Sequence, residues 1–135
     1  MTRSDSGAGN LHWLEEARVA VNADPAFRRL GSADVVLGLA IDGEARLITF
    51  EAFEVTAVRT VTMTELRDAE IVLKMSAVEW AGYLDDRRQG GGSSLLTLDL
   101  DSHLISARDP IARLKLARFN RSLQAFIDAG APLAA

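Results

Sequence analysis

Three residues near the start of the last third of the chain carry the side chains best suited to chemistry. Asp99, Asp101 and His103 alternate along an expected strand, so all three could project from one face of it. Carboxylates and an imidazole so arranged can bind a divalent metal ion or transfer protons. Alternation is also what a half-buried strand needs, with Leu98 and Leu100 on its buried face. We therefore expect no catalytic residue and no metal site, while the role of these three residues stays open.

The remaining residues with chemical potential fit simpler explanations. The glycines at 90–92 lack the Gly-Lys-Ser/Thr ending of a phosphate-binding loop, so we interpret them as a mobile linker. His12 is expected to be a surface histidine on an N-terminal helix. Cysteine is absent, which excludes disulfides, thiol nucleophiles and thiolate metal sites. We expect no cofactor, and no enzyme.

Length and composition predict one domain. The chain has 135 residues, of which 48% are hydrophobic and 25% charged, as in ordinary globular proteins. We expect a disordered tail over 1–10 and a single domain over 11–130. The polar N-terminus and the absence of a long apolar run predict a cytoplasmic protein without a membrane span.

The charge pattern bears on partners. The formal net charge is −4, so we expect no binding to nucleic acid. Only the expected last helix is locally basic, through Arg113, Lys115, Arg118 and Arg121. We interpret these four as a solvated face, although they could also attract anionic lipid head groups in a transient membrane contact. The oligomeric state stays open, and a homodimer is one alternative.

Apolar periodicity and turn signals place the elements that would position any site. Two β-rich runs, 34–41 and 44–50, flank Asp42-Gly43, the strongest short hairpin signal. Further strands are predicted over 52–61, with Phe53, Val55 and Ala57 on one face, and over 69–75 and 95–100. Ser76 and Glu79 form a capping box that begins a helix. Asp109-Pro110 begins the longest helix, which should end at Gly130.

The excess of apolar positions leaves two alternatives. Residues 34–41 are apolar on both faces, and Phe50, Trp80, Phe119 and Phe126 add large side chains to a small sheet. These residues either fill a solid core, which is the commoner outcome, or surround a cavity.

The segment from Phe27 through the Asp42-Gly43 hairpin and a third strand to DAEIVLKMSAVEWAGYL, residues 68–84, resembles the sterol carrier protein type 2 family of lipid-carrier domains. The resemblance lies in order and pattern and spans about Phe27 to Asp128. It implies an α+β fold in which a five-stranded, mostly antiparallel sheet is covered by helices and encloses an internal apolar cavity.

The resemblance also implies a function and a binding wall. An apolar small molecule, such as a fatty acyl chain or a sterol-like lipid, would be held by burial in a carrier or accessory module. The expected wall consists of Phe53, Val55, Ile71, Leu73 and Met75 from the sheet, Trp80 and Leu84 from the middle helix, and Leu116, Phe119 and Leu123 from the last helix. The alternatives are a small cone-fold enzyme of the isomerase, cyclase or epoxide-hydrolase type, with Asp99, Asp101 or Tyr83 in its cavity, and a structural subunit that binds no ligand.

Overall fold

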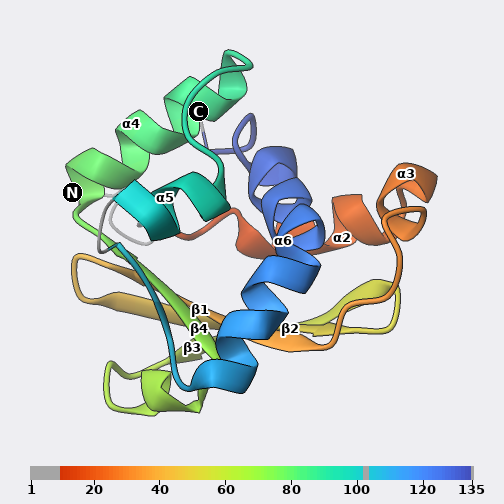
Figure 1. Cartoon of the computed structure of the whole chain (residues 1–135). Coiled ribbons are helices and arrows are strands. Elements are labelled where there is room, and N and C mark those ends of the chain that lie inside the picture. Colours follow the sequence, from red (N-terminus) through yellow and green to blue (C-terminus); the bar gives the residue numbers. More distant parts are fainter. Residues whose placement is uncertain (1–9, 102–103, 135) are drawn as a thin grey trace.

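A computed structural model describes residues 10–101 and 104–134, without the side chains of residues 99–101. The chain forms an α+β fold (Figure 1). Its elements are, in chain order, α2 (Leu14–Asn22), α3 (Pro25–Arg28), β1 (Val35–Ile41), β2 (Glu44–Glu51), β3 (Glu54–Val61), the 3-10 turn η1 (Glu65–Asp68), β4 (Ile71–Met75), α4 (Ala77–Arg88), α5 (Leu95–Asp101), β5 (Ile105–Ala107) and α6 (Pro110–Gly130).

The five strands form one mixed sheet in the order β3-β2-β1-β4-β5. Strands β1 and β4 are parallel, and the other three neighbouring pairs are antiparallel. Figure 1 shows the α-helices on one side of the sheet and η1 on the other, where the chain crosses from β3 to β4. The expected mostly antiparallel, helix-covered sheet is confirmed.

The β1–β2 hairpin forms where the sequence predicts it. Ile41 pairs with Glu44, and Asp42 and Gly43 both take positive φ angles, 46° and 86°. Two consecutive residues in this left-handed region make the tight turn whose twist matches that of the flanking strands.

Strand β3 corrects the predicted alternation. It begins at Glu54, so Phe53 lies in the β2–β3 turn instead of on a strand face. Phe50 pairs with Val55 and Thr49 with Ala57, which leaves Thr56 as an extra residue in a β-bulge. A bulge shifts the alternation by one residue. Val58 consequently packs against the same core as Val55, although the sequence pattern placed these two on opposite faces.

Both predicted helix starts are confirmed. Ser76 Oγ accepts a hydrogen bond from the Glu79 backbone N–H at 3.0 Å, and Glu79 Oε1 accepts from the Ser76 N–H at 2.9 Å. Asp109 Oδ1 accepts from the Ala112 N–H at 2.8 Å at the start of α6. These side chains bond backbone donors that the first helical turn leaves unpaired.

The predicted strand over 95–100 is wrong, because residues 95–101 form helix α5. Ser94 Oγ accepts from the Thr97 N–H at 3.2 Å, and Gln124 of α6 accepts from the Leu95 N–H at 2.8 Å. The fifth strand follows this helix, where Ile105 pairs with Leu73 of β4.

The main core lies between the helices and the sheet, and a smaller cluster lies on the opposite face beneath η1. There Leu66 and Ala69 approach Gly38 so closely that an added Cβ would lie 2.8 Å from each of them. Gly130 plays a comparable role on the helical side, and the predicted end of the last helix at this residue is confirmed. It is the last residue of α6, and a Cβ there would lie 1.9 Å from Cζ3 of Trp13.

Within the described part of the chain, no helix combines the length and the apolarity that a membrane crossing requires.

Candidate ligand pocket

The residues expected to line a ligand site lie mostly in the main core. Eight of the ten are buried there: Val55, Ile71, Leu73, Met75, Trp80, Leu84, Leu116 and Leu123. Phe119 is half-buried and packs against the same core. Phe53 is 42% exposed on the β2–β3 turn, beneath the guanidinium of Arg28.

A pocket of about 310 Å³ opens between α4, the residues around α5, and the end of β4, and we call it the α4–α5 pocket. Its lining is Met75, Glu79, Gly82, Tyr83, Asp86, Ser93, Leu98 and Leu104. Met75 is a buried core residue from the helix-facing side of β4, and Leu98 and Leu104 partly cover that core. The pocket is an open surface hollow, and three of its lining residues belong to or pack against the main core.

One polar network fixes the three helices around this pocket. Gln124 Nε2 donates to Tyr83 Oη at 3.1 Å and to Asp128 Oδ1 at 3.0 Å. Arg87 of α4 binds both carboxylate oxygens of Asp128, with Nε at 2.9 Å and Nη2 at 2.8 Å. Because Gln124 also accepts the Leu95 N–H, its single side chain joins α4, α5 and α6.

The electrostatics of Tyr83 follow from its position. Its side chain is almost wholly buried, and this loss of solvation raises the pKa of the phenol above 10.0. The hydroxyl oxygen accepts from Gln124, so the phenol keeps its own proton as a donor for a second hydrogen bond. Tyr83 thus adds a neutral hydrogen-bond donor to a mixed wall, in which Glu79, Asp86 and Ser93 are polar and Met75, Leu98 and Leu104 are apolar.

Stacked aromatic rings pack α4 against the N-terminal segment. Trp80 stacks on Tyr83, with ring centroids 6.3 Å apart, and on Trp13, with centroids 6.0 Å apart. The Trp80 indole N–H donates to the backbone oxygen of Asn10 at 3.1 Å. The ring positions fix the face of α4 that carries Tyr83.

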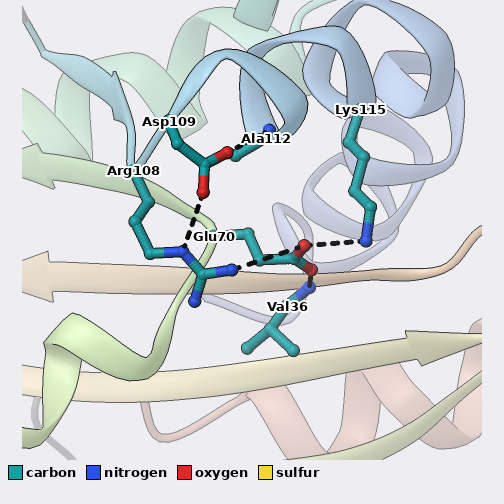
Figure 2. Close-up of polar contacts among 6 residues, drawn as sticks. All are labelled: Val36, Glu70, Arg108, Asp109, Ala112 and Lys115. Atoms are coloured by element: carbon teal, nitrogen blue, oxygen red, sulfur yellow. Dashed lines mark hydrogen bonds and ion pairs between the residues drawn. The ribbon is translucent and has the colours of Figure 1, made fainter.

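A second polar cluster holds the N-terminal end of α6 to the sheet (Figure 2). Glu70 accepts from the Val36 N–H at 3.0 Å and from Lys115 Nζ at 2.7 Å, and Arg108 Nη2 lies 3.9 Å from it. The Glu70 side chain is only 14% exposed. These three partners of its carboxylate are hydrogen-bond donors or cations, so the cluster is suited to joining β1, the start of β4 and α6.

The predicted acidic and histidine cluster does not rest on strand geometry. Asp99 and Asp101 lie in α5, where the alternation of a strand does not apply. The side chains of both residues, and the whole of His103, lie outside the described residues. Among the described residues, no group of three or more acidic or histidine side chains is arranged to hold a metal ion.

Sequence reasoning missed part of the pocket. The sequence pattern places Leu98 on a strand and assigns no site role to Leu104 or to Gln124, which does not line the pocket but holds Tyr83. Gln124 carries no local signal, because its partners lie 29 and 41 residues away along the chain. Ser94 followed by Thr97 was a helix-start signal that could have placed Leu98 correctly.

No protein-family model, curated protein or solved structure matches this chain.

Proposed function

We propose that the protein binds an apolar small molecule, such as a fatty acyl chain or a sterol-like lipid, through the α4–α5 pocket and serves as a carrier or accessory module. The observation that carries this proposal is the pocket itself. Of its lining residues, Met75 belongs to the main core, and Leu98 and Leu104 pack against that core. Its volume of about 310 Å³ lies at the lower end of the range of small-molecule sites.

Binding in such a pocket needs no chemical step. Each Å² of apolar ligand surface removed from water contributes about 25 cal/mol to the free energy of binding. This contribution does not depend on the orientation of the contacting groups. The leucine and methionine side chains therefore favour apolar ligands of many shapes. The Tyr83 hydroxyl supplies one directional contact, a hydrogen bond to an oxygen atom of the ligand.

The order of elements also supports the proposal. A helix, a three-stranded meander, a strand, a helix, a last strand and a C-terminal helix follow one another. The resemblance to the sterol carrier protein type 2 family implies this order. Helix α5 is an addition, in the place where the resemblance implies only a glycine-containing segment.

Gly82 offers a direct test, because it lines the pocket and an added Cβ there would meet no atom within 4 Å. Gly82→Leu should place a side chain in the entrance without a core clash. Delipidated wild-type protein should take up a fluorescent fatty acid at one saturable site, and Gly82→Leu should weaken that uptake. Ala81→Leu is the matched control, since Ala81 is exposed on the same helix but lines a different hollow.

Tyr83→Phe tests the polar contact separately. Removal of one hydrogen bond of about 0.5–1.5 kcal/mol should weaken binding of an oxygen-containing ligand about 2- to 10-fold. A ligand without oxygen should bind both proteins equally.

The proposal fails if no fatty acid or sterol probe binds saturably, or if Ala81→Leu weakens uptake as much as Gly82→Leu.

A further inference from the structure

A line of side chains on the first half of α6 combines exposed apolar and basic groups. Ile111 is 67% exposed and Leu114 is 70% exposed, and Arg118 and Arg121 follow as exposed residues. The spacings of three, four and three residues place these four side chains on one side of the helix. We call these four residues the α6 strip.

Charge is strongly concentrated around this strip. Residues 108–121 contain five basic residues and one acidic residue. The whole chain contains 15 basic and 19 acidic residues, so the remaining sequence holds ten basic and eighteen acidic ones. The strip therefore lies on a positive segment of an otherwise negative chain, and its electrostatic complement is an anionic surface.

The opposite side of α6 is anchored, so the strip has a fixed orientation. Ala112, Leu116 and Leu123 are buried there. Lys115, which lies beside the strip, is held by Glu70 just before β4 (Figure 2). The basic side chains of the strip are not part of that cluster.

We propose that the α6 strip docks on the surface of an anionic lipid membrane. Ile111 and Leu114 enter the interfacial region and leave water, and Arg118 and Arg121 lie at the level of the lipid phosphates. A hollow of about 450 Å³ beside the strip, lined in part by Phe119, gives room for a lipid group. Asp34 is the acidic side chain in that lining.

A second exposed apolar site, on α2, lacks the basic residues that distinguish the α6 strip. Val19 on α2 is 57% exposed, but it lies beside Glu15 and Glu16 in a mainly apolar hollow. Glu15 is paired with Arg18, so Glu16 is the carboxylate here that an anionic membrane would repel. Val19 is therefore the matched control for an apolar residue of similar exposure without the basic excess of the α6 strip.

The test is flotation of the full chain with vesicles of phosphatidylcholine alone or of phosphatidylcholine mixed with phosphatidylglycerol. The wild type should bind the mixed vesicles more tightly, and added salt should weaken that binding. Arg118→Gln and Arg121→Gln should each weaken it about 5-fold. Ile111→Ser combined with Leu114→Ser should weaken it roughly 10-fold, because two large apolar side chains no longer leave water. Val19→Ser should have no effect.

The proposal is overturned if mixed vesicles bind no better than phosphatidylcholine alone, or if Val19→Ser weakens binding as much as the α6 substitutions. It is equally overturned if the strip binds only an acidic protein and no vesicle. Circular dichroism shows whether each variant keeps its fold. Gly82→Leu should bind vesicles like the wild type, so failure of the pocket and failure of the docking strip are told apart.

Discussion

Tyr83 is the only tyrosine in the chain, so tyrosinate absorbance reports on this one residue of the α4–α5 pocket. Burial raises its pKa, and we expect its absorbance to titrate at higher pH in the folded protein than in the protein unfolded by guanidinium. Overlapping titration curves would contradict the buried position. A ligand bound in the pocket should raise the pKa of Tyr83 further, because it removes more water from the phenol.

The same shift predicts how stability depends on pH. The folded-state pKa of Tyr83 is raised above its unfolded value, so the neutral phenol contributes stability that is fully present below pH 10.0. That contribution is lost as the pH rises through the folded-state pKa. Denaturant unfolding of Tyr83→Phe should lack this part of the alkaline decline, since phenylalanine does not ionise.

At the scale of elements, the contact between α6 and α2 depends on the missing side chain of Gly130. A Cβ there would lie 1.9 Å from the Trp13 ring, so Gly130→Ala should destabilise the protein by about 1–3 kcal/mol. Gly82→Ala is the control in an open helical position, where alanine should stabilise by about 0.5–1 kcal/mol. Denaturant unfolding measures both, and equal effects of the two substitutions would contradict the packing of α6 on α2.

Elements with a local chemical signal could be predicted from the sequence. The Asp42-Gly43 hairpin and the Ser76 capping box each depend on residues within a few positions of one another. Their backbone geometry needs no distant partner, so the pattern and the structure agree.

Elements decided by distant contacts could not be predicted in the same way. Residues 95–101 are too short for apolar spacing to separate a helix from a strand, and Gln124 supplies one of the bonds at the start of α5. The bulge at Thr56 is likewise invisible in an alternating sequence, although it changes the face of Val58. The pocket lining also contains both kinds of residue. Met75 is an expected site residue, whereas Leu104 is not.

At the scale of the whole molecule, one apolar cluster includes residues from the helical layer and from the sheet. It contains Trp13 beside α2, Trp80 of α4, Phe126 of α6 and Phe50 of β2. Phe50 and Phe126 meet edge to face with centroids 5.8 Å apart, which joins the sheet directly to α6. No layer can leave this cluster without exposing the apolar side of another.

This shared core predicts unfolding in a single cooperative step. Trp13 and Trp80 are the two tryptophans and are stacked within the core, so their fluorescence reports on the contact between the N-terminal segment and α4. Far-ultraviolet circular dichroism reports on all helices and strands. The two signals should give coincident denaturant transitions, because loss of either layer removes the packing of the other. If the fluorescence changed at lower denaturant concentration than the circular dichroism, the N-terminal segment and α4 would form a separate unit.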